Sequence, residues 1–220
     1  MFQRRFDRKK GAAPLNASLN AAGEGGYGSA QIGRLIDIVL SSPTMEKLLR
    51  SAPRLGLGDY YIGAGCVAQT VWNRLSGLPP EYGIQDIDLV YFDDADLSED
   101  GERRTALEAE RLFAELPIRL DVKNEARVHL WYERRFGYPI EPYGSLEEAI
   151  DTWPTTATAI GVRADGQGGW RVYAPYGLDD LLGLIVRPNK VQITRHIYEA
   201  KTARWTSRWP GLNVVPWDGE

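Results

Sequence analysis

The feature that most constrains the fold is a strand–turn–helix unit followed by a second strand that carries two carboxylates. Residues 60–62 form a short apolar strand, residues 63–65 a glycine turn, and an amphipathic run follows. The second strand opens with Asp86-Ile87-Asp88. Side chains alternate along a strand, so Asp86 and Asp88 share one face while Ile87 points to the other. The sequence therefore predicts a strand with one apolar face and one carboxylate-bearing face.

The carboxylate-bearing face has the chemistry of a metal site. Two ionised carboxylates side by side repel each other, and a bound divalent cation is the usual remedy. Asp121 lies on a later alternating strand, residues 118–122, and can complete a three-carboxylate cluster. Such a cluster holds two Mg²⁺ ions roughly 3.5–4 Å apart in enzymes of phosphoryl transfer. The alternative is a surface strand with exposed aspartates, which is disfavoured because Asp is depleted in strands.

The glycine turn at residues 63–65 is typical of an anion-binding site. Glycines let the backbone approach a ligand closely, and the first free N–H groups of the following helix point toward it. Gly63 and Gly65 are thus candidate phosphate-binding residues. Turn chemistry alone supports equally well a tight turn with no ligand.

The fold class expected from the remaining pattern is α/β (α+β), a mixed sheet flanked by helices with a C-terminal hairpin and helix. Apolar spacing predicts helices that start near Ser29 and at Pro43, and a capping box at 145–148 predicts another. The other expected elements are a helix over 125–136, a hairpin of residues 158–163 and 170–174, and helices over 177–184 and 191–209.

Residues 1–28 are expected to form a flexible basic tail, and residues 29–220 a single domain. The first 28 residues are rich in Gly, Ala and Asn and have few large apolar groups. Residues 1–10 carry a net charge of +4, which leaves −8 for the remainder of a chain whose net charge is −4. This balance disfavours nucleic acid as a partner, without excluding it.

Composition also favours a cytoplasmic protein. The only cysteine is Cys66, which cannot form an intramolecular disulfide and is typical of a reducing compartment. No apolar run approaches the roughly 18 residues needed to span a bilayer, so no membrane partner is expected. The basic start also fits a mitochondrial transit peptide, which is the less favoured interpretation.

Several motifs of the chain resemble those of a known superfamily. Tyr61-Ile62-Gly63-Ala64-Gly65-Cys66-Val67, followed by Asp86-Ile87-Asp88, resembles the opening of the polymerase-beta-type nucleotidyltransferase superfamily, which includes the CCA-adding enzymes. Over about residues 58–217 the chain is more similar to a family of small stand-alone nucleotidyltransferases with unassigned substrates. Further matching motifs include Val122-Lys123-Asn124-Glu125, Trp153-Pro154-Thr155-Thr156 and Ala174-Pro175-Tyr176-Gly177.

The resemblance implies transfer of a nucleoside monophosphate from an NTP to an unknown acceptor, with Mg²⁺ as cofactor. Asp86, Asp88 and Asp121 would be the catalytic residues and metal ligands, and Asp121 the base for an acceptor hydroxyl. The residues implied to bind the nucleotide are Gly63, Gly65, Cys66, Lys123 and Asn124. The rival hypothesis is a catalytically silent nucleotide-binding or interaction protein with the same fold.

Two positions depart from the superfamily pattern. Cys66 stands where Gly or Ser is common, and a thiol is a poor hydrogen-bond donor. Ala68-Gln69 stands where the CCA-adding pattern has Arg-Asp, so one phosphate-binding cation is missing. Candidate replacements, besides Lys123, are Arg187, Lys190 and a helical row of Lys201, Arg204 and Arg208. A solvated helix face is the favoured interpretation of that row.

Overall fold

A six-stranded mixed sheet organises the protein. The computed structural model describes residues 19–21 and 28–219. Within these residues the strand order is β1-β6-β5-β2-β3-β4. The strands are β1 (Leu19–Ala21), β2 (Tyr60–Gly63), β3 (Asp86–Tyr91), β4 (Arg119–Asn124), β5 (Gly161–Ala164) and β6 (Trp170–Tyr173). The β3–β4 and β1–β6 pairs are parallel and the other pairs antiparallel, so the expected mixed sheet is confirmed.

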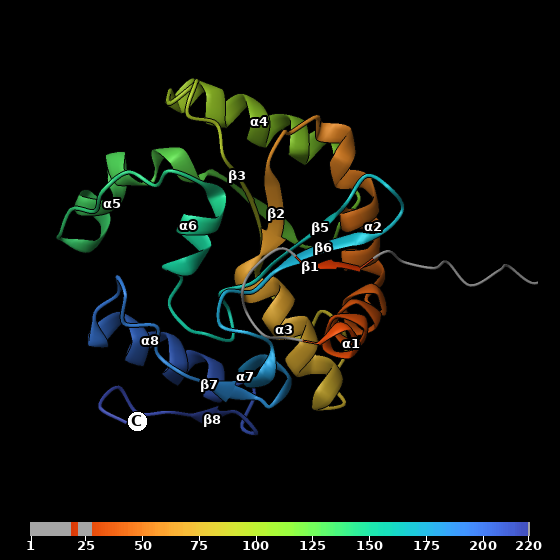
Figure 1. The fold of residues 1–220 in the computed structure, drawn as a ribbon, viewed down its shortest axis with the longest axis vertical. Helices are drawn as coiled ribbons and strands as arrows, with labels where there is room; N and C mark the ends of the chain where they lie inside the picture. The colour runs from red at the N-terminus through yellow and green to blue at the C-terminus, as the bar shows by residue number, and fades with distance from the viewer. Residues whose placement is uncertain (1–18, 22–27, 220) are drawn as a thin grey trace, which may run out of the picture.

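Helices surround this sheet, as Figure 1 shows. The longer ones are α1 (Ser29–Leu40), α2 (Pro43–Ser51), α3 (Ala64–Leu75), α4 (Glu99–Leu112), α5 (His129–Phe136), α6 (Leu146–Asp151) and α8 (Arg195–Thr206). Short elements complete the set: α7 (Asp179–Leu182), the 3-10 turns η1 (Ala52–Leu55) and η2 (Glu125–Arg127), and a separate parallel pair of strands, β7 (Ile185–Val186) with β8 (Asn213–Val214). None of the helices in the described part of the chain is long and apolar enough to cross a membrane.

The two faces of the sheet pack differently. On one face, Ile87 and Leu89 of β3 join a large core that receives side chains from α1, α2, α3, α4 and α8. On the other face, Tyr61 and Val90 belong to a small cluster closed by Leu146 and Ile150, around α6. The even-numbered residues of β3 lie on this second face, so Asp86 and Asp88 are on the face that is only partly covered.

Local sequence signals account for several element boundaries. The Ser42 side chain accepts a hydrogen bond from the N–H of Met45, and Pro43 occupies the first turn of α2. The Ser145 hydroxyl likewise accepts from the N–H of Glu148 and starts α6. The predicted hairpin is present as β5 and β6.

Two expectations from the sequence need correction. Leu19–Ala21 pairs with β6 where a flexible tail was expected, because main-chain pairing to a sheet edge needs no apolar side chains; residues 1–18 and 22–27 lie outside the described residues. The helical segment predicted over 125–136 is present as η2 followed by α5. The last helix starts at Arg195 instead of residue 191, since Asn189 accepts a hydrogen bond from the N–H of Val191 and holds a turn there.

Candidate functional site

The parallel pairing of β3 and β4 brings together the predicted carboxylates. Asp88 lies directly opposite Asp121 in the register of the two strands, and Asp86 lies opposite Arg119. Asp86 and Asp88 share a face because they are two residues apart on one strand. All three carboxylates are therefore neighbours on the partly covered face of the sheet. Each retains some exposure to solvent.

The three carboxylates repel one another, and this repulsion contributes to a raised pKa of Asp88. Burial, together with the charges of Asp86 and Asp121 and against the opposing effect of Lys201 and Lys123, raises the pKa of Asp88 to about 7. Lys123 Nζ lies 3.1 Å from Asp121 Oδ1. The site is therefore a cluster of negative charge with cations at its border.

The donor set suits a hard divalent cation. Asp86, Asp88 and Asp121 supply only carboxylate oxygens, the ligands that Mg²⁺ prefers. A cation would also relieve the repulsion that raises the pKa of Asp88. Among the described residues, no group of three or more His, Cys, Asp or Glu side chains is already arranged to hold a metal ion. Metal binding would thus require these side chains to turn toward a common point.

The glycine turn joins β2 to α3 beside the carboxylates. A Cβ at Gly63 would lie 2.5 Å from the carbonyl oxygen of Ile160 and 2.9 Å from the Trp153 ring, so packing alone requires a glycine there. Ala64 has φ of 55°, a left-handed conformation that costs an alanine about 1 kcal/mol. Its N–H donates to Ile160 O at 3.0 Å, which helps to hold this turn. Gly65 instead lines the cavity at the carboxylates.

Two predicted nucleotide-binding side chains do not face that cavity. Cys66 is buried in the large core, its Sγ donates to the carbonyl of Gly63 at 3.0 Å, and burial raises the pKa of its thiol. The Asn124 amide Nδ2 donates to Asp93 O at 2.8 Å, and its Oδ1 accepts from the N–H of Asp93 at 3.0 Å. These bonds make Asn124 an anchor for the loop after β3. The alternating pattern of β4 could not distinguish that role from ligand binding.

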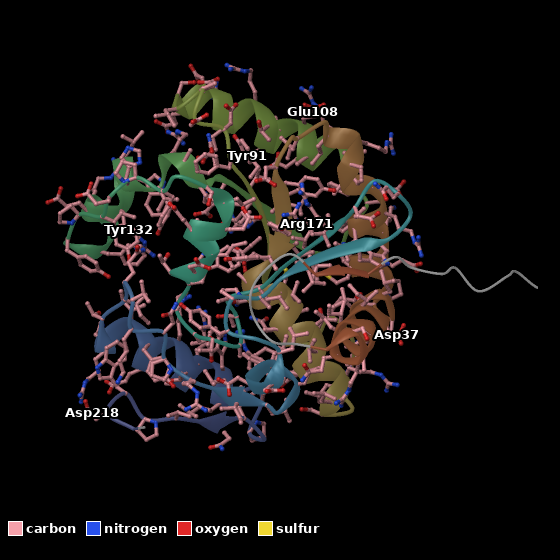
Figure 2. The ribbon with its side chains drawn as sticks, in the orientation of Figure 1. Asp37, Tyr91, Glu108, Tyr132, Arg171 and Asp218 are labelled. Carbon is pink, nitrogen blue, oxygen red and sulfur yellow. The ribbon has the colours of Figure 1, made fainter. Side chains whose placement is uncertain are left out.

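Two adjoining cavities meet at the carboxylates. The first, which we call the polar cavity, has a volume of about 430 Å³, and its charged and polar lining includes Gln69, Asp86, Asp88, Arg135, Lys201 and Arg204. The second, which we call the aromatic cavity, has a volume of about 320 Å³ and includes Trp131, Tyr132, Phe136, Tyr143 and Trp153 in its lining. Asp88, Asp121, Lys123 and Glu125 line both. Tyr132, labelled in Figure 2, marks the α5 side of the aromatic cavity.

Sequence reasoning missed Glu125 as a site residue. It is only 7% exposed, yet it lines both cavities. Burial, together with the charges of Asp88 and Glu102, raises the pKa of Glu125 to about 8. Glu125 lies in the 3-10 turn after β4, where no periodic pattern predicts which way a side chain points. The only signal was its place beside Lys123 and Asn124 in a matching motif.

The helical row of basic residues divides between two roles. Lys201 and Arg204 line the polar cavity; Arg204 is exposed, as expected for a solvated face, whereas Lys201 is partly buried and departs from that interpretation. Burial lowers the pKa of Lys201, with a further contribution from Arg204 and opposition from Asp88 and Asp86. Arg208 instead donates through Nη1 to Gly83 O at 3.1 Å. Lys201 and Arg204 can therefore supply the positive charge that Ala68-Gln69 lacks.

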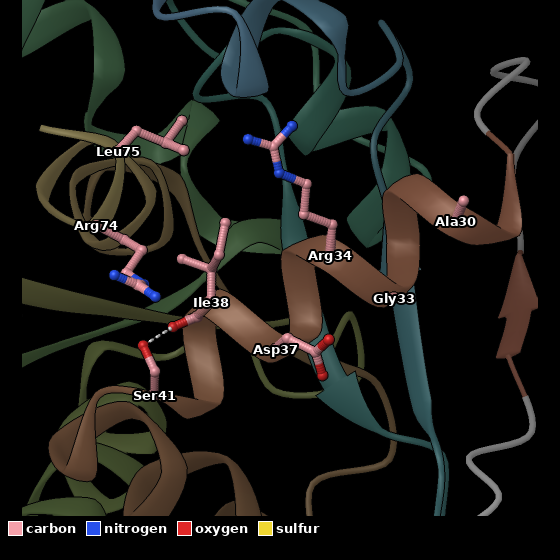
Figure 3. Close-up of a pocket in the computed structure, with 8 residues that line it drawn as sticks. All are labelled: Ala30, Gly33, Arg34, Asp37, Ile38, Ser41, Arg74 and Leu75. Atoms are coloured by element: carbon pink, nitrogen blue, oxygen red, sulfur yellow. Dashed lines mark hydrogen bonds between the residues drawn. The ribbon is translucent and has the colours of Figure 1, made fainter.

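A larger cavity, of about 710 Å³, lies away from the carboxylates. It runs between α1 and α3, and Figure 3 shows Arg34 and Arg74 among its lining residues. Asp37 is its only acidic residue, and it contains none of the described buried side-chain atoms that lack a hydrogen-bond partner. Size alone therefore does not single out a candidate site, and the convergence of charged side chains favours the cavities at the carboxylates.

Comparison with known proteins identifies the family. A family model described as nucleotidyltransferase matches residues 50–214. The chain belongs to this nucleotidyltransferase family. The match includes the glycine turn, the three carboxylates and the helix that carries Lys201. A search of the curated proteins found no match.

One solved structure supports the fold of this nucleotidyltransferase-family protein. A structure described as "The NMR structure of the protein reveals a CCA-adding enzyme head domain" is similar with a TM-score of 0.69 and 25% identity, over 84% of this chain and 95% of that one. Two structures of a tRNA-processing enzyme match at 18% identity, each with a TM-score of 0.41. They cover 80% and 76% of this chain, which spans 43% and 42% of theirs. The fold is that of a nucleotidyltransferase head domain.

Proposed function

We infer that the protein is a Mg²⁺-dependent nucleotidyltransferase that moves a nucleoside monophosphate from an NTP to an acceptor hydroxyl. The observation that carries this inference is the placement of Asp88 beside Asp121 in the register of β3 and β4. That pair lines a cavity which also contains Gly65 and the cations of α8. Membership of the nucleotidyltransferase family supports the same reaction class.

Several groups in the polar cavity have a role in this reaction. The start of α3 at Gly65 offers backbone N–H groups to the triphosphate. Lys201 and Arg204 offset its negative charge. Asp86, Asp88 and Asp121 would hold Mg²⁺, which neutralises charge on the phosphates and favours in-line displacement when bound.

The reaction balances with Asp121 as the proton acceptor. The acceptor oxygen forms a bond to the α-phosphorus of the NTP, and the bond from that phosphorus to the oxygen bridging the α- and β-phosphates breaks. Pyrophosphate leaves, and the hydroxyl proton passes to the Asp121 carboxylate. Lys123 Nζ, 3.1 Å from Asp121 Oδ1, can hold this carboxylate in place.

Pyrophosphate release tests the proposal. The purified protein is incubated with NTP and Mg²⁺, with water and small hydroxyl compounds as acceptors, and compared with Asp88→Asn and Asp121→Asn. Release by the parent and its loss in both variants is the expected result. Stabilisation by NTP without Mg²⁺-dependent release from any acceptor would instead favour the catalytically silent nucleotide-binding protein. If NTP neither binds nor reacts, both functions fail.

A further inference from the structure

The aromatic cavity contains a buried carboxylate that the proposed reaction does not use. Glu125 is only 7% exposed. Its carboxylate lines the cavity, and no described residue forms a hydrogen bond or ion pair with it. A largely buried acidic group without a donor is costly, and its oxygens are not among the described side-chain atoms that are both enclosed and unpaired, so they open onto the cavity. The charges of Asp88 and Glu102 disfavour its ionised form, and Lys123 opposes them. The group is thus available to accept hydrogen bonds from a ligand.

A second polar side chain of the cavity is oriented by its neighbour. Gln192 Oε1 accepts a hydrogen bond from Tyr143 Oη at 2.9 Å, and the same Oη lies 2.8 Å from Thr152 Oγ1. Because its oxygen is engaged, Gln192 has its Nε2 amide left as the group for a ligand. No described residue accepts from Nε2. Apart from Asp88, Asp121, Lys123 and Lys201, which lie at the proposed metal and phosphate site, the polar groups of the cavity include a donor, Gln192 Nε2, and two acceptors, the oxygens of Glu125.

The walls of the cavity suit a planar ring. Aromatic side chains bind nucleobases by stacking, which tolerates any base because every base has a π face. The aromatic residues come from α5 and from the segments on either side of α6. The volume of about 320 Å³ lies at the lower end of the range typical of small-ligand pockets. Its shared lining with the polar cavity allows one molecule to place phosphates in the first and a ring in the second.

Resting on the proposed function, we propose that the aromatic cavity is the nucleobase subsite and that Glu125 and Gln192 select guanine. The Watson–Crick edge of guanine presents one carbonyl acceptor followed by two N–H donors. That order complements one amide donor and two carboxylate oxygens. Adenine and cytosine place an amino group beside a ring acceptor, and uracil has a single N–H between two carbonyls, so none of them satisfies both Glu125 oxygens.

Binding of guanine would also remove the cost of the buried acid. Two N–H donors stabilise the ionised form of Glu125 and lower its pKa. In Glu125→Gln the amide offers one acceptor and one donor, so the donor faces an N–H of guanine. The loss of a good bidentate pair corresponds to about tenfold or more in affinity.

The test measures binding of ATP, GTP, CTP, UTP and inosine triphosphate, each with Mg²⁺, to the full chain. Inosine triphosphate lacks the 2-amino group of GTP, so it removes one donor without a mutation. We expect the parent to bind GTP most tightly and inosine triphosphate about tenfold more weakly. Glu125→Gln should lose this difference, while Glu133→Gln, an exposed glutamate on α5, should keep it.

The outcomes separate this inference from the reaction itself. If NTPs bind but GTP has no advantage over the others or over inosine triphosphate, the guanine subsite is wrong and the transferase proposal stands. A preference for GTP that persists in folded Glu125→Gln also overturns it, because the cavity would then hold the acceptor or nothing. Should Glu125→Gln fail to fold, the comparison of GTP with inosine triphosphate on the parent decides. If no NTP binds to the parent, both proposals fail.

Discussion

The two faces of β3 have opposite environments although they share one backbone. Ile87 and Leu89 are fully buried in the large core, whereas Asp86 and Asp88 keep contact with solvent at the polar cavity. On the first face, α3 and α4 lie across the sheet; on the second, only the small cluster around α6 covers Tyr61 and Val90. The fully packed face holds the carboxylate-bearing backbone in place, so the other face can carry repelling charges.

The comparison explains how the site is stabilised. Stability comes from apolar burial on the covered face, because the carboxylates of the open face destabilise each other in the absence of a cation. Substitutions on the two faces should therefore have opposite consequences. Stability should fall when the covered face is altered, and ligand binding should fall when the open face is altered.

The largest expected effect is on the covered face. Leu89 is 0% exposed, so Leu89→Ala leaves a cavity and should lower the free energy of unfolding by about 2–5 kcal/mol. Denaturant unfolding of the parent and the variant measures the difference. If the loss is below about 1 kcal/mol, this face does not carry the stability of the sheet.

The second effect, on the open face, depends on pH. The pKa of Asp88 is about 7 in the folded protein, well above its usual value near 4, so between these values the folded protein holds a proton that the unfolded chain has lost. The free energy of unfolding of the metal-free protein should therefore fall as pH rises from about 4 to 8, by at most about 4 kcal/mol. Solvent at this partly buried group reduces that figure.

The matched variant for this pH dependence is Asp88→Asn. It should show a smaller fall with pH and equal or higher stability at pH 8, because it removes one repelling charge. It should also lose any stabilisation by NTP with Mg²⁺. Unfolding curves between pH 4 and pH 9 measure both quantities. Lower stability of Asp88→Asn at every pH would mean that Asp88 is a structural residue.

The third effect distinguishes the two glycines of the turn. Gly63→Ala places a Cβ against Ile160 O and the Trp153 ring and should cost about 1–3 kcal/mol. Gly65→Ala meets only the end of the Gln69 side chain, at 3.0 Å, and should leave stability within about 0.5 kcal/mol while weakening NTP binding. Thermal unfolding with and without NTP measures both. Equal loss of stability would show that the two positions are equally packed.

The smallest effect concerns Cys66, which the sequence assigned to nucleotide binding. Its thiol belongs to the covered face, so Cys66→Ala should cost about 1 kcal/mol and leave NTP binding unchanged. Native protein should also react slowly with thiol reagents, since burial raises the pKa of this thiol. Weaker NTP binding in a stable Cys66→Ala protein would place the side chain at the site after all.

Much of the fold could be predicted from the sequence because strong periodic signals coincide with its main elements. The alternation around Asp86-Ile87-Asp88 placed β3 and its two faces, and Ser42 and Ser145 marked helix starts. Leu19–Ala21 could not be predicted, because a three-residue edge strand depends on a long-range partner, β6. The predicted last helix begins too early, because the turn at Asn189 depends on one side-chain hydrogen bond.

In the candidate site, too, the residues on regular strands could be predicted and those beyond the strand ends could not. Periodicity and family motifs placed Asp86, Asp88 and Asp121 on one face, which the strand register bears out. Glu125 was missed, and Asn124 was assigned a role in binding, because both lie where β4 ends and regular alternation stops. Their orientations are decided by tertiary contacts, which a single sequence does not reveal.

The register of β3 and β4 also has a consequence for how such a chain can change over time. Main-chain hydrogen bonds between two parallel strands fix the separation of Asp88 and Asp121, so residues 92–118 do not set it. The closure entropy of a connection grows only slowly with its length. Insertions on the outer side of α4, near the exposed Leu107, should therefore leave the carboxylates in place. New recognition surfaces can arise there without rebuilding the chemistry.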